Sequence, residues 1–571
     1  MKKFVASILA ATCVLGAIGC GPVGADMGNN DADSDKTEIT VKNYNGGVGR
    51  KWLDNAVERF TEAYANESFA EGKTGIDVKV LDGDLTTIAL GSEAYQVYIT
   101  SGAYMSVSEL AQLGILYDMT GIVTDTTRKG DTLENLIYDG AKPAFMHDGK
   151  YYGLPHYANS NGVSFDRDLF DEAGLYFADE EETDVVAYTG KDIKITRNFV
   201  SSEDAKKTVG MDGVKDTEDD GMPCSLEEFI LLMDYIKNEK SDMSISPIVV
   251  SGKYHGYIQL YLQGLTFSLA GSEQMNNYSN CTGEIDIITG YTEEPLFPGI
   301  DYIKKPIVET VTLTEEDKNG YLTTQLAAKY YAMATVEIIH KEGYFAKEAY
   351  NTSVDHYSTQ KCMIYAGAAE YDRVAMLMEG SYWYNEAKKS GVLNSYVTIS
   401  GDREERGVAW MSLPTAVYSK DVKEGEISPI FTGPGAQVVI NANIKGNTEY
   451  EKACAAFVSF LYSDEELAAF TVETGCTRNL KYSLTDEEIG KMPKFYQSLW
   501  NSRKEDGSNT LINYPTTATG LKVASHIELN LNSAMWEKFN LYHYVRGTKN
   551  TKQMFEDMKY TASKWNEVLD S

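Results

Sequence analysis

Apolar residues near the start of the chain alternate between short strand-like runs and one-sided helical faces. Residues 38–41 (EITV), 76–80 (IDVKV) and 95–100 (YQVYIT) are rich in β-branched and aromatic side chains, which is typical of strands. Apolar side chains at helical spacing follow the first run: Trp52, Leu53, Ala56, Val57, Phe60 and Tyr64. A strand, a Gly-rich turn and a helix in this order predict an α/β fold.

The loops after two of these strands carry candidate ligand-binding residues. The Gly-rich loop after the first strand presents Tyr44 and Asn45, and Thr100, Ser101 and Tyr104 follow the third strand. Open α/β sheets bind ligands beyond the carboxyl ends of their strands. The first loop lacks the glycine and lysine spacing of phosphate-binding loops, so we expect it to face a neutral ligand.

Residues 148–175 contain the clearest change of pattern in the chain. The turn signal Asp148-Gly149 precedes an aromatic run, and the chain then breaks at Gly153-Leu154-Pro155. A polar patch, a second apolar segment and a short helical pattern follow, and the helix is expected to end at Gly174. This order predicts a strand, a kinked crossing, a second strand and a helix.

The same segment, DGKYYGLPHYANSNGVSFDRDLFDEAGL, resembles DGK-x-YGLP…YN-x-D-L-F-x-x-AGL of extracellular solute-binding protein family 1. These maltose-binding-protein-like lipoproteins deliver sugars to ABC importers. The resemblance implies a two-lobed periplasmic-binding-protein-like fold of type II. Each lobe would be a mixed sheet flanked by helices, with several crossings at the hinge, and this segment would pass from the first lobe into the second across the ligand cleft.

The resemblance implies that the crossing contributes polar groups to the ligand site, namely His156, Tyr157, Asn159 and Asn161. Asn159 stands four residues after Pro155, where related maltose receptors place a carboxylate. An amide at this position donates and accepts hydrogen bonds to hydroxyl groups. The alternative is that these residues form a solvated hinge loop.

A second segment, residues 371–388 (YDRVAMLMEGSYWYNEAK), resembles the A-A-M-x-x-x-G-x-W stretch of the same family. There an aromatic side chain stacks on the sugar ring, since a sugar has an apolar C–H face. The family's aromatic residue most often stands two residues after the glycine, which is Tyr382 here, and Trp383 is its neighbour. We expect Glu379, Tyr382 and Trp383 to contact the ligand; packing of Trp383 in the core is the alternative.

Later segments also resemble the family and suggest how the lobes divide. Residues 407–414 (GVAWMSLP) resemble the family's return into the first lobe, which implies a second crossing near Trp410. We expect Trp410 and Trp536 to face the ligand, although core packing is at least as good an interpretation of Trp536. The expected first lobe is residues 38–156 plus about 405–475, and the expected second lobe is 157–404 plus about 476–571.

Residues from about 176 to 222 form an acidic insertion where the family normally has only a few residues. Four aspartates cluster near its end: Asp212, Asp216, Asp219 and Asp220. Closely spaced carboxylates suit Ca²⁺, which prefers oxygen ligands. The spacing is not that of an EF-hand, so a solvated acidic loop is the alternative to a structural calcium site, and no other cofactor is expected.

The N-terminus has the pattern of a secretory signal. In residues 1–19, Lys2 and Lys3 precede an apolar run that is too short to span a bilayer comfortably. A small residue before Cys20 resembles the bacterial lipobox, which implies lipidation of Cys20 with palmitate-type chains; an ordinary signal-peptidase site is the alternative. Residues 20–37 would then be the lipidated cysteine and a flexible polar tether, and the protein would be anchored outside the cell membrane.

Composition excludes several classes of partner. With 571 residues and 43% hydrophobic content, the chain is long enough for two or three domains with sizeable cores. Its 84 acidic and 52 basic residues give a formal net charge of −32, which opposes binding to nucleic acid or to an anionic membrane. Five widely spaced cysteines after Cys20 predict no disulfide framework.

Motifs of common enzymes are missing from the sequence. It contains no GxSxG, HExxH or CxxC, and its seven histidines are scattered without the spacing of zinc ligands. We therefore expect a monomeric, non-enzymatic lipoprotein of an ABC importer that captures an extracellular carbohydrate, in particular an oligosaccharide, by hinge closure and delivers it to a permease. Two alternatives remain: a secreted glycosidase or lyase, whose paired carboxylates would be apparent only in space, and a peptide or polyamine receptor of the same architecture.

Overall fold

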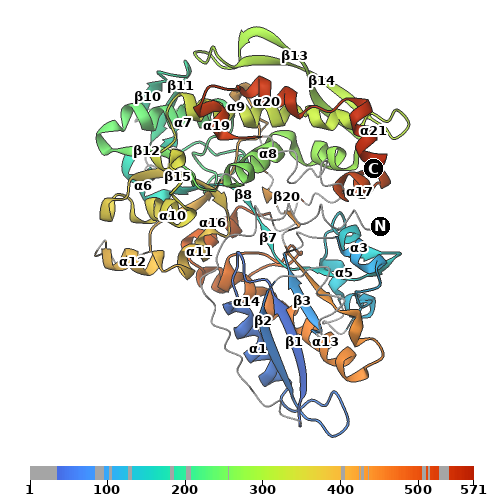
Figure 1. Ribbon diagram of the computed structural model, residues 1–571. Coiled ribbons are helices and arrows are strands. Elements are labelled where there is room, and N and C mark those ends of the chain that lie inside the picture. The colour runs from blue at the N-terminus through green and yellow to red at the C-terminus, as the bar shows by residue number, and fades with distance from the viewer. Residues whose placement is uncertain are drawn as a thin grey trace.

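The computed structural model describes most of the chain after residue 34. The described residues are 35–83, 95–101, 106–126, 131–179, 185–200, 207–254, 256–399, 401, 405–423, 425, 428, 430–431, 433–434, 436–504, 509–511, 515–525 and 539–570. They form two lobes, each built around its own sheet, with the first lobe at the bottom of Figure 1 and the second above it.

The first lobe contains a five-stranded sheet of order β2-β1-β3-β19-β6. Its strands are β1 (Thr37–Asn43), β2 (Ile76–Asp82), β3 (Val97–Thr100), β6 (Leu154–Pro155) and β19 (Gln437–Ile440). β1 pairs with β2 and β3 in parallel, whereas β19 is antiparallel to β3 and β6. Three helices surround this sheet: α1 (Lys51–Ala63), α13 (Thr448–Leu461) and α14 (Asp464–Thr474). The predicted α/β start of the chain is confirmed, because the apolar face of α1 packs into the core of this lobe.

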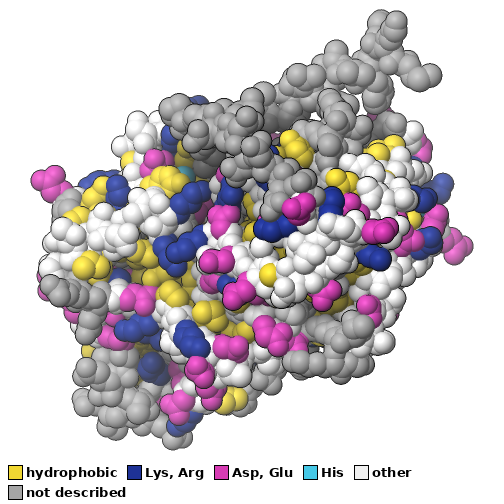
Figure 2. Space-filling view, turned by 90° about the horizontal axis from the view of Figure 1, so that it is seen from below, with side chains coloured by type: hydrophobic (Ala, Val, Ile, Leu, Met, Phe, Trp, Pro, Cys, Tyr) yellow, Lys and Arg dark blue, Asp and Glu magenta, His cyan; other side chains and the backbone are white. Residues whose placement is uncertain are grey.

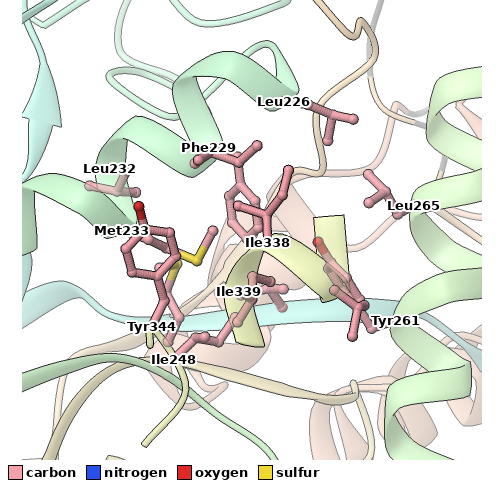
Figure 3. Close-up of a cluster of buried hydrophobic side chains, with 14 of the residues drawn as sticks. Leu226, Phe229, Leu232, Met233, Ile248, Tyr261, Leu265, Ile338, Ile339 and Tyr344 are labelled. Carbon is pink, nitrogen blue, oxygen red and sulfur yellow. The ribbon is translucent and has the colours of Figure 1, made fainter. Parts of the chain in front are cut away.

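The second lobe contains a four-stranded sheet of order β12-β15-β8-β16. Its strands are β8 (Asn161–Asp166), β12 (Ile245–Val249), β15 (Arg373–Gly380) and β16 (Val408–Met411). The main helices around it are α7 (Leu226–Glu239), α8 (Gly256–Asn280), α9 (Ala327–Lys341) and α10 (His356–Tyr365). Figure 3 shows how Phe229 of α7 and Ile338 of α9 meet in the largest buried cluster of this lobe. A long hairpin, β13 (Gly283–Pro295) and β14 (Lys304–Leu313), lies over its outer side.

One expected lobe boundary is wrong. β16 pairs with β8 through Trp410 opposite Ser164, so residues 408–411 belong to the second sheet rather than returning to the first. The chain rejoins the first sheet only at β19, after Gly433–Pro434 has paired with Ala158–Asn159 at the crossing. The hydrogen bonds of the strand, not its apolar content, determine the sheet to which it belongs.

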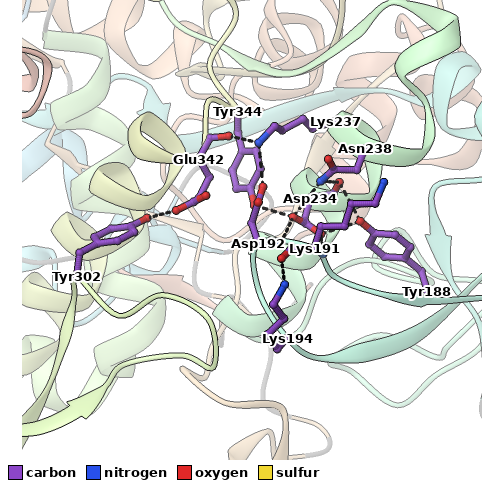
Figure 4. Close-up of polar contacts among 10 residues, drawn as sticks. All are labelled: Tyr188, Lys191, Asp192, Lys194, Asp234, Lys237, Asn238, Tyr302, Glu342 and Tyr344. Carbon is purple, nitrogen blue, oxygen red and sulfur yellow. Dashed lines mark hydrogen bonds and ion pairs between the residues drawn. The ribbon is translucent and has the colours of Figure 1, made fainter.

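The acidic insertion folds onto the second lobe. It contains β9 (Tyr176–Phe177), β10 (Val186–Thr189) and β11 (Thr196–Val200), which form a small antiparallel sheet of order β10-β11-β9. Its loop is fixed to α7 by the buried carboxylate of Asp234, which accepts hydrogen bonds from the backbone N–H groups of Lys191 at 2.7 Å and Asp192 at 2.9 Å. The hydroxyls of Tyr188 and Tyr344 donate to the same carboxylate at 2.7 and 3.1 Å, as Figure 4 shows. The insertion is therefore a packed element with an internal polar anchor.

Acidic and basic side chains are interspersed over the face of the molecule shown in Figure 2. No described helix is long and apolar enough to cross a membrane.

The cysteines of the described residues are free, and four of the five are buried: Cys281, Cys362, Cys454 and Cys476. Cys20, Tyr104 and Trp536, for which we predicted roles, lie outside the described residues.

Candidate functional site

The two lobes meet where three segments come together, and we call this region the lobe boundary. The segments are the loop from Tyr44 to Gly49, the crossing from Pro155 to Asn161, and the turn from Glu379 to Tyr382. They include most of the predicted ligand-binding residues.

The loop after β1 reaches from the first lobe toward the second. Gly47 has φ +62°, and a Cβ built on it would lie 2.9 Å from the Tyr157 hydroxyl and 3.9 Å from the Tyr382 Cβ. The neighbouring side chain of Asn45 turns the other way and donates to Asp82 Oδ2 at 3.3 Å, within the first lobe. The loop thus brings its backbone close to two of the predicted tyrosines.

The crossing and the turn from Glu379 to Tyr382, which we call the aromatic turn, lie at the ends of two paired strands, β8 and β15. Asn161 lies opposite Gly380 in the β8–β15 ladder. The Ser381 N–H donates to the Ser160 carbonyl at 2.8 Å, which continues the pairing beyond the ladder. Two segments more than two hundred positions apart are therefore held side by side, and the structure brings together Asn159, Asn161, Glu379 and Tyr382.

The amides of the crossing form a continuous hydrogen-bonded chain. Asn159 Nδ2 donates to Asn161 Oδ1 at 3.0 Å, and Asn161 Nδ2 donates to Gln263 Oε1 at 3.3 Å. The Ser381 hydroxyl donates to Asn159 Oδ1 at 3.3 Å. Because both ends of the Asn159 amide are used, an amide rather than a carboxylate fits this position.

Tyr382 is half-buried and lies at the centre of the lobe boundary. A Cβ at Gly380 would overlap its ring, so the turn requires a glycine there. Burial raises the pKa of the Tyr382 hydroxyl well above its usual value. Four neighbouring acidic groups raise it further: Glu386, Glu379, Tyr157 and Tyr44. The two glutamates belong to the second lobe, Tyr157 to the crossing and Tyr44 to the loop after β1, so groups of all three segments act on the Tyr382 hydroxyl.

Trp383 and Trp410 are core residues, and our prediction that they face the ligand is wrong. Trp383 is 0% exposed; its indole N–H donates to Ser164 Oγ at 2.9 Å, and its ring packs against Phe495 at a centroid distance of 5.2 Å. Trp410 is buried in the same cluster. Trp383 opens α11 (Trp383–Lys389) with its side chain directed into the second lobe, whereas Tyr382 precedes the helix.

His156 also has a structural role, contrary to our prediction. It is buried in the first lobe, where its ring lies 4.9 Å from that of Trp52 and its Nδ1 accepts from Arg478 Nη1 at 3.0 Å. Burial, with the nearby guanidinium, holds the pKa of His156 well below its usual range, so the ring is neutral at pH 7. The next residue, Tyr157, reaches the lobe boundary, where its hydroxyl lies close to Gly47.

Thr100 and Ser101 lie at the carboxyl end of β3, as predicted, but Thr100 is buried by its pairing with Gln437. A residue that the sequence did not single out lies at the neighbouring strand end. Asn43, the last residue of β1, is 0% exposed, and neither side-chain atom has a hydrogen-bond partner among the described residues. Buried amides are normally hydrogen-bonded, so Asn43 is a candidate for contact with a ligand or an ordered water.

A cluster behind the aromatic turn was also not predicted, apart from Glu379. Gln360 Nε2 donates to Glu379 Oε1 at 3.0 Å and approaches Glu386 Oε2 at 3.4 Å. His356 Nε2 lies 3.6 Å from the same Glu386 oxygen. Burial raises the pKa of Glu386 to about 7, and burial together with Glu386 raises that of Glu379 well above its usual value. Glu379 and Glu386 lie at or near the turn in sequence, whereas His356 and Gln360 come from the preceding helix α10 (His356–Tyr365), so no local pattern joins the four side chains.

The aspartates of the insertion bind their own loop. Asp219 Oδ2 accepts from the backbone N–H groups of Met211 at 2.7 Å and Asp212 at 3.1 Å, and Asp220 Oδ2 accepts from that of Asp216 at 2.8 Å. Across the described part of the chain, no group of three or more His, Cys, Asp or Glu side chains is placed to hold a metal ion. The predicted calcium site thus gains no support from the geometry of these carboxylates.

Comparisons with known proteins identify the fold. No family model matches the chain, and no curated protein matches its sequence. Among solved structures, a chitin oligosaccharide binding protein aligns over 94% of this chain and 100% of its own, with 14% identity and a TM-score of 0.52. RafE in complex with raffinose aligns over the same shares, with 14% identity and a TM-score of 0.50. Maltose-bound MalE3 of T. maritima aligns over 93% of this chain and 99% of its own, with 12% identity and a TM-score of 0.50. The chain therefore has the two-lobed α/β fold of these binding proteins.

Proposed function

We propose that this protein is the carbohydrate receptor of an ABC importer, which captures an extracellular oligosaccharide at the lobe boundary and delivers it to a membrane permease. The observation that carries the proposal is the meeting of Tyr382, Tyr157 and the buried amides at the point where the lobes touch. The solved structures of the same fold, whose titles name chitin oligosaccharide, raffinose and maltose, support a carbohydrate as the ligand.

The chemistry of the lobe boundary suits a sugar. A pyranose presents apolar C–H groups on its faces, which pack on a flat tyrosine ring, and hydroxyls around its edge. Asn43 offers a buried donor and acceptor without partners among the described residues, which a hydroxyl would satisfy. Closure of the lobes would desolvate those hydroxyls, so each must find such a partner.

The N-terminal sequence supports a location outside the cell membrane. Residues 1–19 have the pattern of a secretory signal, and we infer that Cys20 carries the lipid anchor and that the following polar residues form the tether. The receptor then acts as a monomer that meets the permease in its ligand-bound form.

The pair of carboxyl groups at Glu379 and Glu386 also raises the question of a glycosidase. Such enzymes need both carboxyl groups at the scissile bond, one on each side of it. Glu379 is 1% exposed and accepts a hydrogen bond from Gln360, so only Glu386 meets solvent. We therefore favour binding without turnover, and release of shorter sugars from an oligosaccharide by the purified protein would contradict this.

A thermal-shift screen of the mature protein against neutral and amino-bearing oligosaccharides tests the proposal. Ligand at 100 times Kd should stabilise the folded state by about 2.7 kcal/mol. Tyr382→Ala should remove most of this shift. Tyr371→Ala should leave it unchanged, because Tyr371 is a half-buried tyrosine just before the opposite end of β15. If no carbohydrate shifts the melting temperature while a peptide does, the proposal is wrong.

A further inference from the structure

The cluster behind the aromatic turn joins three elements of the second lobe. Glu379 is the last residue but one of β15, Glu386 lies in the first turn of α11, and His356 and Gln360 lie on α10. α10 packs against both β15 and α11, which places the four side chains together. One amide nitrogen, Gln360 Nε2, serves both carboxyl groups, at 3.0 and 3.4 Å.

The two buried carboxyl groups of the cluster have no cationic side chain paired with them among the described residues, and burial raises the pKa of both. Within the described residues, no ion pair joins Glu379 or Glu386 to a lysine or arginine. Lys389 acts on Glu386 only at longer range, and His356 Nε2 lies 3.6 Å from a Glu386 oxygen. Burial holds the pKa of His356 below its usual value, so this base does not supply a positive charge at neutral pH. Buried carboxyl groups are normally paired with a cation.

The cluster also contains acceptor atoms that no described donor reaches. Gln360 is 0% exposed and its Oε1 has no hydrogen-bond partner, and His356 is 2% exposed with no hydrogen bond at either ring nitrogen. An unpartnered buried polar atom is costly, and a neutral imidazole needs one donor at its free nitrogen. Gln360 Oε1, the unprotonated nitrogen of His356 and the carboxyl oxygens can all accept hydrogen bonds. An ammonium group matches them, because it supplies three donors and no acceptor.

Tyrosine rings surround the same point. The rings of Tyr357, Tyr254 and Tyr257 lie 3.9, 5.5 and 5.9 Å from the His356 ring, centroid to centroid. Tyr382 approaches from the lobe boundary, and its hydroxyl responds to the charges of Glu379 and Glu386. An aromatic ring attracts a cation and can also pack on the apolar face of a sugar. These tyrosines therefore suit a sugar that carries an amino group.

We propose that the oligosaccharide bound by this protein carries a protonated primary amino group, and that Glu386, with Glu379, Gln360 and His356 behind it, is the subsite that binds this group. Glu386 is the entry point, because its side chain is 17% exposed and the others are buried. The inference rests on the proposed function, since it assigns the chemical class of the sugar to the same lobe boundary.

The test uses two ligands that differ only in acetylation, measured by calorimetry on the full mature chain at pH 6.5. The probes are the tetramer of glucosamine, which has free amino groups, and the tetramer of N-acetylglucosamine, which has none. We expect the glucosamine tetramer to bind at least about tenfold more tightly, the range of one charge-assisted hydrogen bond. Glu386→Gln should abolish the preference, whereas Glu487→Gln, at an exposed glutamate on α15 (Asp486–Gly490), should retain it.

The outcomes separate this inference from the proposed function. If neutral or N-acetylated sugars bind as well as the glucosamine tetramer, the amine subsite is wrong and the carbohydrate receptor stands. If spermidine binds and no sugar does, both are wrong, because the cation is then not borne by a carbohydrate. The melting temperature of Glu386→Gln without ligand controls for misfolding, and a preference for glucosamine that survives in the folded variant overturns the role of Glu386.

Discussion

Tyr382 and Trp383 are neighbours in the chain, yet their side chains lie on opposite sides of the turn. The tyrosine is half-buried at the lobe boundary, and the tryptophan is enclosed among Ser164, Phe495 and Tyr384. Trp383→Ala should therefore lower the free energy of unfolding by about 3–5 kcal/mol, the cost of removing a buried aromatic side chain. Urea denaturation followed by circular dichroism measures this loss.

The milder variant Trp383→Phe keeps most of the buried area and loses only the donor to Ser164. Ligand binding by this variant should equal that of the natural protein. A variant that folds with normal stability but no longer binds sugar would contradict the core assignment and return Trp383 to the ligand site.

The sequence narrowed the aromatic candidates at this turn to two residues but could not choose between them. Which side chain faces outward depends on where β15 ends and α11 begins. β15 ends at Gly380, but no side-chain cap marks the start of α11 at Trp383. His356 and Gln360 escaped prediction for a different reason. They are joined to Glu386 only by the packing of α10 on α11, which leaves no periodic signal in the sequence.

At the scale of elements, local signals were reliable. The predicted helix after β8 ends at Gly174, which has φ 64° as a left-handed cap requires, and Ser225 caps α7 by accepting from the Glu228 N–H at 3.2 Å. The sheet to which a short apolar strand belongs was not predictable. β16 (VAWM) and β19 (QVVI) are both four residues long and buried on both faces, so their composition suits either sheet.

The buried carboxylate of Asp234 is a central anchor of the acidic insertion on α7. Asp234→Ala would remove the acceptor of two backbone N–H groups and the shorter hydrogen bond of two tyrosine hydroxyls, so it should destabilise the protein by roughly 3 kcal/mol. Hydrogen exchange should show the loss of protection first in β10 and β11. Asp242→Ala, at an exposed aspartate just beyond the same helix, should have no effect, and equal exchange in both variants would show that Asp234 does not fix the insertion.

At the scale of the whole molecule, contacts between the lobes lie on either side of the aromatic turn. The backbone of Gly47 lies against Tyr157 and Tyr382, and Asn385 Nδ2 of α11 donates to the carbonyl of Thr474 at the end of α14 at 2.6 Å. Both contacts join residues of different sheets, so opening of the lobes must break them. Val472 of α14 also packs on the buried cluster around Trp383, so opening of the lobes would break apolar as well as polar contacts.

Gly47 offers a way to disturb the lobe boundary without removing any ligand-binding side chain. In Gly47→Val the new Cβ would meet the Tyr157 hydroxyl at 2.9 Å, so the closed arrangement should be disfavoured and sugar affinity should fall about tenfold or more. Gly49→Val is the matched control, because Gly49 also has a positive φ, of +74°, but its Cβ would meet only Asn45 Oδ1 at 4.0 Å. Both variants share the strain of a left-handed valine, about 1–2 kcal/mol, so a difference between them reports the contacts of residue 47 with Tyr157 and Tyr382. Small-angle scattering with saturating ligand should show compaction for Gly49→Val and not for Gly47→Val; compaction of both would mean that the contact at Gly47 does not control closure.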